Sequence, residues 1–258
     1  MTIPGLAVRE DDGVLTIRFD RPASFNALTD EMTLGAAELL ERAGARDDVR
    51  VVVLTGTGPA FTTGADISGE DAHERFDVRA LDAANRLVRA ILRCDTPVVA
   101  GVNGVAAGVG LSAVLACDLA VCTESASLLL AFARVGLMPD GGATATVAAS
   151  IGRARAMRMA LLAEPLTARA AYDAGLVSHV VADADYETEL AAVVDTLRDG
   201  APLGQAATKR AVNAAALAQV EPALELERTT QTMLLRTSDV AEGMRAFSEK
   251  RRPRFTGD

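Results

Sequence analysis

Two glycine-rich turns, about forty residues apart, are the segments of this chain best suited to stabilise a reacting group. Residues 58–67 follow the apolar run at 51–54, and residues 103–110 follow the apolar run at 96–100. Because each turn leaves a buried-strand pattern, its backbone N–H groups are free to point into a shared cleft. One N–H group from each turn could then hold a negative charge that develops on a single oxygen. The pair therefore suggests a chemistry as well as a fold.

The cysteines indicate neither a metal site nor a disulfide framework. Cys94, Cys117 and Cys122 are odd in number and lie in or near apolar segments without metal-ligand spacing. We expect reduced thiols in the core and no bound metal. The N-terminus, Met1-Thr-Ile-Pro-Gly, has neither the basic start nor the apolar run of a signal peptide. Both features indicate a cytoplasmic protein.

Composition limits the class of protein further. Half of the 258 residues are hydrophobic but only 3% are aromatic, so the core is mainly Ala, Val and Leu. The net charge of −9 argues against general nucleic-acid binding. Residues 98–117 are uncharged and long enough to span a bilayer, but Asn103 and four glycines interrupt this stretch after Pro97. A strand, a turn and a short buried helix explain it better, and we expect no membrane partner.

Alternating strands and helices position the two turns. Strand patterns cover 14–19, 49–54, 98–102, 119–122 and 176–181. Helical patterns cover about 30–44 with Thr29 as the cap, 70–93, a short segment after the second turn, 153–162, 167–174 and 186–198. This alternation predicts parallel strands with helices outside them.

The last sixty residues or so form a helical region, with helices expected at 202–217 and 222–236. Their apolar positions have no strand layer of their own to cover, so we expect them to pack on the core or on another subunit. We divide the chain into residues 1–200, a core with the active site, and residues 201–258, a helical oligomerisation region.

Several segments together resemble the enoyl-CoA hydratase/isomerase (crotonase) family. They are residues 19–22 with 26–28, 61–67, 97–118, 136–144, 174–177 and 242–251, in the family's order and spacing over nearly the whole chain. The resemblance implies an α/β fold, a spiral of ββα units with a C-terminal helical region that forms trimers. It also implies a homotrimer or a hexamer built as a dimer of trimers. The substrate would be an acyl-CoA thioester, with CoA as part of the substrate and no permanently bound cofactor or metal.

By position in the sequence, the resemblance assigns the oxyanion hole to the N–H groups of Ala65 and Val109. Val109 stands where the family commonly has Gly, but a backbone donor does not require Gly. Each donor of this kind contributes about 3 kcal/mol to transition-state stabilisation. The residues that the resemblance assigns to CoA or substrate contacts are Thr63, Ala65, Asp66, Ile67, Ser68 and Val109.

The carboxylates decide which reaction follows, and here the chain departs from the hydratase pattern. The family's hydratases use two glutamates, and the alignment places Ser112 and Phe132 at those positions. A serine hydroxyl does not act as a general base unaided, and Phe has no acid–base function. Both residues are candidates for lining the active site.

Asp140 stands where isomerase-type members, including those that act on ring-derived acyl-CoA, carry an acidic residue. A single carboxylate can take a proton at C2 and return it at C4, and an apolar cleft around Phe132, Leu137 and Met138 would raise its pKa. Pro139-Asp140-Gly141-Gly142 also favours a turn without any chemistry.

Three further residues have both a functional and a structural interpretation. His73 lies in an acidic stretch that could border the acyl pocket, or it could be a surface residue. The family places an aromatic residue and a lysine against the CoA of a neighbouring subunit, which indicates Phe247 and Lys250. The basic segment 250–254 is also consistent with a solvated tail.

Three functions remain possible at this point. The first is an enoyl-CoA isomerase that uses Asp140. The second is a hydratase or another reaction of the family that uses Ser112, His73 or a water molecule. The third is a CoA-ester-binding oligomer with little catalysis.

Overall fold

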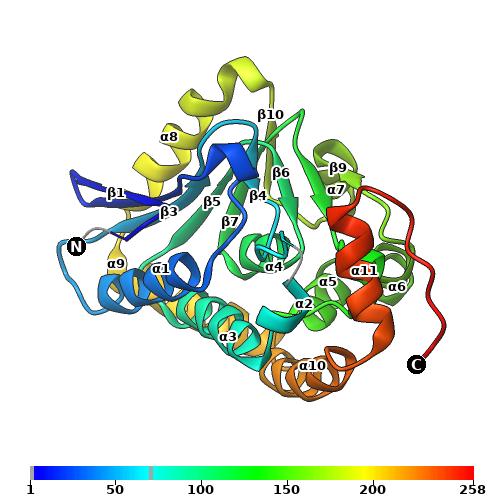
Figure 1. Cartoon of the computed structure of the whole chain (residues 1–258). Coiled ribbons are helices and arrows are strands. Elements are labelled where there is room, and N and C mark those ends of the chain that lie inside the picture. Colours follow the sequence, from blue (N-terminus) through cyan, green and yellow to red (C-terminus); the bar gives the residue numbers. More distant parts are fainter. Residues whose placement is uncertain (1–2, 70–71) are drawn as a thin grey trace.

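The computed structural model describes residues 3–69 and 72–258 (Figure 1). Six strands form the main sheet in the order β1-β2-β3-β5-β7-β10. They are β1 (Leu6–Asp11), β2 (Val14–Phe19), β3 (Val51–Gly56), β5 (Val98–Val102), β7 (Leu119–Thr123) and β10 (His179–Val181). Only β1 is antiparallel to its neighbour, and the other five run parallel, as the alternating pattern predicts.

A second sheet of four short strands lies beside the first, in the order β4-β6-β8-β9. These strands are β4 (Ala60–Thr62), β6 (Val105–Ala107), β8 (Ser127–Leu129) and β9 (Leu166–Thr167). The chain therefore repeats one unit: a long strand, a short strand in the second sheet, and a helix. The repeats β3-β4-α3, β5-β6-α4 and β7-β8-α5 form the spiral of ββα units that the resemblance implied.

Helices cover both faces of the main sheet. The described helices before the C-terminal region are α1 (Asp30–Ala43), α2 (Ala72–Arg75), α3 (Val78–Arg93), α4 (Val109–Ala116), α5 (Ala143–Ile151), α6 (Arg153–Leu162), α7 (Ala168–Ala174) and α8 (Tyr186–Arg198). The short 3-10 helices are η1 (Pro22–Ser24), η2 (Phe132–Val135) and η3 (Asp183–Asp185). Figure 1 shows α8 on one side of the main sheet and α1 and α3 on the other.

The two-residue period of the strands explains this arrangement. Val51, Val53 and Val99 pack with Tyr186 and Leu190 of α8. Their sequence neighbours, among them Val52, Leu54 and Val98, belong to the larger core on the opposite face. A strand with both faces buried has a continuous run of apolar residues, and for this reason these strands could be predicted from the sequence.

The C-terminal region is helical, with α9 (Pro202–Ala216), α10 (Val220–Leu234) and α11 (Ser238–Ser248). Within the chain, α10 contacts α3 and α5, while α11 contacts α2 and η2. The packing of these helices on the core was one of the two expected outcomes. The division at residue 200 stays a prediction.

Some boundaries were wrong. The helix expected over 70–93 is two helices, because Asp77 starts α3 by accepting a hydrogen bond from the Arg79 N–H at 2.8 Å. Residues 70 and 71 lie outside the described part of the chain. The strand expected over 176–181 begins only at His179, because the Leu176 N–H still bonds to the Ala171 carbonyl at the end of α7. The pattern also missed β1, the second sheet, α5 and α11.

The uncharged stretch at 98–117 contains β5, β6 and all of α4, so it is not one helix. Within the described ranges, no helix has the length and apolar character needed to cross a membrane. The three cysteines are free thiols; Cys94 and Cys122 are buried, as expected, and Cys117 is partly exposed.

Candidate active site

The first glycine-rich turn leaves β4 and runs beside the segment that precedes α1. Leu28 bonds across to it twice: the Leu28 N–H donates to the Gly64 carbonyl at 2.8 Å, and the Asp66 N–H donates to the Leu28 carbonyl at 2.9 Å. In such a parallel bridge the flanked residue, Ala65, directs its own N–H away from Leu28. The Ala65 N–H is therefore directed away from this segment and is not used in the bridge.

The second turn ends at the N-terminus of α4. Gly108 is its N-cap, with a φ of 55°, and provides no side-chain hydrogen bond to the first turn of this helix. Val109 is the first helical residue, so its N–H has no intrahelical acceptor. The positive end of the α4 dipole adds to the potential that favours an anion beside this N–H.

Glycines allow the two turns to touch. A Cβ atom on Gly64 would lie 2.8 Å from the Ala107 carbonyl oxygen and 3.4 Å from the Val109 nitrogen. A Cβ atom on Gly110 would lie 2.9 Å from the Thr62 carbonyl oxygen. The structure thus brings the turns of Ala65 and Val109 into backbone contact, as the sequence interpretation requires, while their catalytic role stays a prediction.

Asp140 lies in the loop before α5 and next to the second turn. A Cβ atom on its neighbour Gly141 would lie 2.9 Å from the Ser112 Cβ and 3.5 Å from a Val109 methyl carbon. The side chain of Asp140 is buried; Oδ2 accepts a 2.9 Å hydrogen bond from Gln231 Nε2, and Oδ1 has no partner among the described residues. A buried polar atom without a partner is rare and calls for an explanation.

The surroundings of Asp140 favour its neutral form. Burial raises the pKa of Asp140 to about 7, the hydrogen bond from Gln231 opposes this, and the negative charge of Glu227 raises the pKa further. The carboxyl group therefore changes between its two protonation states near neutral pH, which suits a group that both takes and returns a proton.

Ser112 and Phe132 also lie around this point. Ser112 is fully buried, and its hydroxyl donates a 2.7 Å hydrogen bond to the backbone carbonyl of Asp140. Phe132, at the start of η2, is buried and has a ring carbon 3.9 Å from the position of a Cβ on Gly108. Both residues are therefore part of the same cluster as Asp140 and the second turn.

The structure does not bring His73, Phe247 and Lys250 to this cluster within one chain. His73 is exposed on α2, where its nearest charged partner is Glu74 at 3.9 Å. The Phe247 side chain is 58% exposed at the end of α11, and Lys250 follows it on the surface. The expected contact of these two residues with CoA from another subunit stays a prediction.

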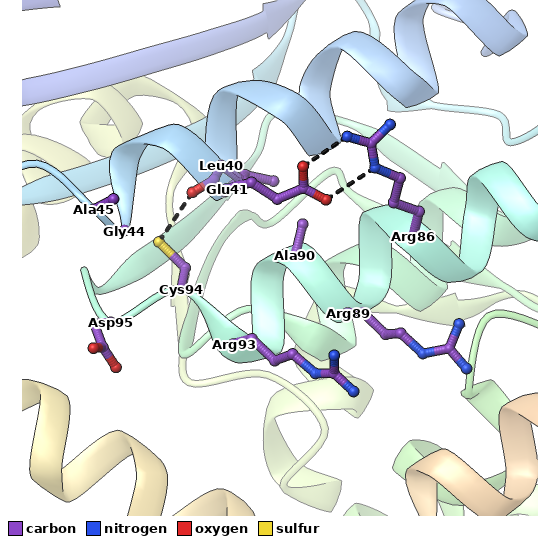
Figure 2. Close-up of a pocket in the computed structure, with 10 residues that line it drawn as sticks. All are labelled: Leu40, Glu41, Gly44, Ala45, Arg86, Arg89, Ala90, Arg93, Cys94 and Asp95. Carbon is purple, nitrogen blue, oxygen red and sulfur yellow. Dashed lines mark hydrogen bonds and ion pairs between the residues drawn. The ribbon is translucent and has the colours of Figure 1, made fainter.

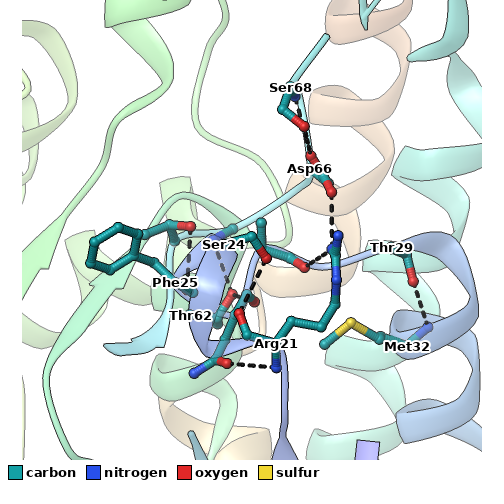
Figure 3. A network of polar contacts seen from close by, with 12 residues as sticks. Arg21, Ser24, Phe25, Thr29, Met32, Thr62, Asp66 and Ser68 are labelled. Atoms are coloured by element: carbon teal, nitrogen blue, oxygen red, sulfur yellow. Dashed lines mark hydrogen bonds and ion pairs between the residues drawn. The ribbon is translucent and has the colours of Figure 1, made fainter. Parts of the chain in front are cut away.

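A polar network fixes the segment after the first turn (Figure 3). Arg21 Nη1 forms a 2.9 Å ion pair with Asp66 Oδ2. The same nitrogen donates a 2.6 Å hydrogen bond to the Ala27 carbonyl. Asp66 Oδ1 accepts hydrogen bonds from the N–H and the hydroxyl of Ser68. Burial alone would raise the pKa of Asp66, but the bonds from Ser68 and Arg21 outweigh it and lower that pKa. Asp66 thus caps a local turn through its hydrogen bonds with Ser68.

Thr63 and Ile67 complete the set of residues expected to contact CoA. Thr63 is exposed and bonds to the Phe25 carbonyl through its N–H at 3.2 Å, and Ile67 is half-buried against the main core. We call Thr63, Asp66, Ile67 and Ser68 the strip; they lie within the second half of the first turn and directly after it.

A hollow of about 490 Å³ lies away from this cluster, between α1 and α3 (Figure 2). Its arginines are already paired: Arg86 with Glu41, and both Arg89 and Arg93 with Glu221. Since each of these arginines is already in an ion pair and none of the described residues that line the hollow has a buried, unpartnered side-chain atom, we place the candidate site at Asp140 instead.

Sequence reasoning missed two residues of the cluster, Glu227 and Gln231 of α10. Glu227 is fully buried and accepts hydrogen bonds from the N–H groups of Gly142 at 2.7 Å and Thr144 at 3.0 Å, and from the Thr144 hydroxyl. The signal was present, because Glu227 and Gln231 continue the buried stripe of Val220 and Leu224 at helical spacing. Polar residues on an apolar stripe need buried partners.

Comparison with known proteins gives consistent results along the whole chain. A family model described as enoyl-CoA hydratase/isomerase matches residues 9–258. A probable enoyl-CoA hydratase of Rhodobacter capsulatus is 40% identical, with 95% of each chain covered. The 1,2-epoxyphenylacetyl-CoA isomerase of Escherichia coli is 34% identical, with 96% of each covered. A crystal structure of an enoyl-CoA hydratase from Mycobacterium avium subsp. paratuberculosis is 44% identical, covers 99% of this chain and 100% of its own, and superposes with a TM-score of 0.94.

Proposed function

Because the chain belongs to the enoyl-CoA hydratase/isomerase family, we propose that it moves the double bond of an enoyl-CoA thioester with Asp140 as the proton carrier. The single observation that carries this proposal is the buried carboxyl of Asp140, with one oxygen unpartnered, beside the turn of Val109. Family membership makes this chain an acyl-CoA enzyme, and we infer isomerisation from the site around Asp140.

The proposed reaction has two proton transfers. The C2–H bond of a 3-enoyl-CoA breaks, its proton passes to the Asp140 carboxylate, and the electron pair delocalises onto the thioester oxygen. The N–H groups of Ala65 and Val109 would stabilise that oxyanion. The dienolate then takes a proton from the Asp140 carboxyl at C4, which restores the thioester carbonyl and leaves the double bond between C2 and C3.

Hydration is the second candidate, since the 40% identical relative is named a hydratase. Hydration needs a second acid–base group besides the one that acts at C2. The Ser112 hydroxyl already donates a hydrogen bond to the Asp140 carbonyl, and Phe132 is apolar. Both oxygens of Glu227 already accept hydrogen bonds from the loop before α5. These contacts favour isomerisation, and turnover of crotonyl-CoA to its hydrated product would reverse that preference.

We propose that the substrate supplies CoA as part of its thioester and that no metal or other cofactor takes part. Ala65, Val109 and the strip of Thr63, Asp66, Ile67 and Ser68 would bind the thioester and the nucleotide. Phe247 and Lys250 would act from a neighbouring subunit of a homotrimer or of a hexamer. Their exposure at the end of α11 is consistent with that role.

The test compares wild type with Asp140→Asn on a 3-enoyl-CoA ester. The proposal predicts that this variant loses isomerisation while it still binds an acyl-CoA. Asp48→Asn, at an exposed ion pair with Arg46, is the matched control and should keep full activity. Unchanged turnover in Asp140→Asn would reject the assignment, and binding without turnover or proton exchange by wild type would favour a non-catalytic CoA-ester-binding protein.

A further inference from the structure

The geometry points to Gln231 as a positioning residue that holds Oδ2 of Asp140 and thereby leaves Oδ1 as the oxygen that exchanges the proton. This inference rests on the proposed function, because it concerns the same carboxyl group. It adds a residue from the C-terminal helical region, 91 positions away in sequence, to the proton-transfer machinery.

The backbone of Met138 fixes the orientation of the Gln231 carboxamide. The Met138 N–H donates to Gln231 Oε1 at 3.1 Å, so this end of the amide must be the oxygen. Nε2 donates to the Met138 carbonyl at 2.9 Å and to Asp140 Oδ2 at 2.9 Å, which uses both of its hydrogens. A flipped amide would place its NH₂ group against the Met138 N–H, so the donor toward Asp140 is determined.

Helix α10 holds the loop before α5 at two places. Gln231 binds Met138 and Asp140, and Glu227, one helical turn earlier, binds Gly142 and Thr144. Residues four apart lie on one face of a helix, so both side chains reach the loop together. Because both side chains are fully buried, the Asp140 carboxyl is attached to a rigid support.

The described groups around Asp140 leave Oδ1 without a hydrogen bond. Helix α10 contributes Glu227 and Gln231, whereas α4 contributes Ser112 and Val109, which carry no charge. In η2, Arg134 is directed to the Ala163 carbonyl instead. Glu227 is therefore the one charged group recorded as acting on Asp140 among the described residues.

These contacts give Oδ1 and Oδ2 of Asp140 different roles. When Asp140 takes the proton from C2, the new O–H bond forms at Oδ1, because the Oδ2 lone pair toward Gln231 is already occupied. The same O–H bond breaks when the proton passes to C4, and Gln231 keeps its hydrogen bond to Oδ2 throughout. Gln231 also stabilises the ionised form, since hydrogen bonds to a carboxylate favour its charge.

The first test is Gln231→Met, which removes the donor and nearly conserves the volume. Loss of a hydrogen bond to a charged group corresponds to about one to two pKa units. In wild type, kcat/KM should rise with pH through about 7, where Asp140 ionises. In Gln231→Met this rise should move upward by about one to two pH units, and kcat/KM near neutral pH should fall roughly tenfold.

A second variant keeps the test informative if Gln231→Met does not fold. Gln231→Glu retains the shape of the side chain and the acceptor for Met138, but places a second carboxyl beside Asp140. The like charge should move the pH profile upward as well. Gln205→Met on α9, where Gln205 donates a hydrogen bond to the Leu197 carbonyl far from Asp140 in sequence, is the matched control and should leave the profile unchanged.

The outcomes separate this inference from the proposed function. An upward shift in folded Gln231 variants supports the positioning role, because a purely structural role would lower stability without moving the profile. An unchanged profile in a folded Gln231 variant, with Asp140→Asn inactive, rejects the role of Gln231 and leaves the proposed function intact. Full activity of Asp140→Asn rejects both.

Discussion

The hydroxyl of Ser112 donates a 2.7 Å hydrogen bond to the backbone carbonyl of Asp140 and so joins helix α4 to the loop before α5. Helix α4 begins with Val109, and therefore the same helix carries one end of the candidate oxyanion hole and one support of the candidate base. The residue that replaces a hydratase glutamate thus has a definite structural contact in this chain.

Removal of that contact should affect the position of Asp140 but not its ionisation. Ser112→Ala should lower the free energy of unfolding by about 1–2 kcal/mol, the range for a buried hydrogen bond. Activity should fall less than in Asp140→Asn, and the pH profile of kcat/KM should keep its midpoint. Ser150→Ala, which removes a hydroxyl bonded within α5, is the control. A Ser112→Ala variant as inactive as Asp140→Asn would indicate that Ser112 takes part in the chemistry.

The contact between the two glycine-rich turns gives a steric prediction. A Cβ on Gly110 would lie 2.5 Å from a Thr62 methyl carbon, so Gly110→Ala should separate the turns and misalign the N–H groups of Ala65 and Val109. Loss of one oxyanion donor lowers kcat by roughly 10²–10³-fold, and we expect a loss approaching this range.

Gly204→Ala provides the control for Gly110→Ala. Gly204 is also helical, but its Cβ would meet only the Ala201 methyl group at 3.9 Å. This variant should keep full activity and gain up to about 1 kcal/mol in stability, because Ala favours helix over Gly. Steady-state kinetics of both variants measure the difference, and normal kcat in Gly110→Ala would argue against a catalytic role for these turns.

Much of the fold could be predicted from sequence because its main strands are buried on both faces. The run at Val51–Gly56 is buried at every position, and α3 has a clear amphipathic period. The second sheet was missed because strands such as Ala60–Thr62 are too short to show any period. Antiparallel β1 was missed because all of its residues after Leu6 are exposed.

The candidate site was only partly predictable for a different reason. Asp140, Ser112 and Phe132 were found by their positions in the family resemblance, and the structure places them close together. Glu227 and Gln231 reach the same loop from a helix about ninety residues later, a contact that only the tertiary fold creates. His73 was predicted from its acidic neighbourhood, which does not determine the direction of its side chain.

The stability of the protein should depend on the ionisation of Asp140. Its pKa is about 7 when folded and lies near the ordinary aspartate value of 3.8 when unfolded. Between these values the unfolded chain binds fewer protons than the folded one, so this group makes stability fall as pH rises. Below pH 3.8 and above about pH 7, the contribution of Asp140 to the free energy of unfolding does not change with pH.

Asp140→Asn removes this dependence. Relative to wild type, the variant should gain about 2–3 kcal/mol in free energy of unfolding between about pH 5 and pH 8. Chemical denaturation at the two pH values measures this difference, with Asp48→Asn as the exposed control. An equal difference between variant and wild type at both pH values would show that Asp140 is not buried with a raised pKa.

Glu227 should change the pH profile in the direction opposite to Gln231. Its negative charge raises the pKa of Asp140, so Glu227→Gln should move the rise of kcat/KM to lower pH. This variant should also lose stability, since an NH₂ group would replace one acceptor of the loop N–H groups. Glu225→Gln, exposed on the same helix, should change neither property. An upward shift in Glu227→Gln would contradict this electrostatic assignment.

Solvent deuterium exchange tests the central claim most directly, because it detects removal of the C2 proton whatever product follows. Wild type incubated in D₂O with a small panel of enoyl-CoA esters should introduce deuterium at C2 or C4 of at least one of them. Asp140→Asn, still able to bind the ester, should introduce none. Equal deuterium uptake by Asp140→Asn and wild type would contradict the assignment of Asp140 as the group that carries the proton.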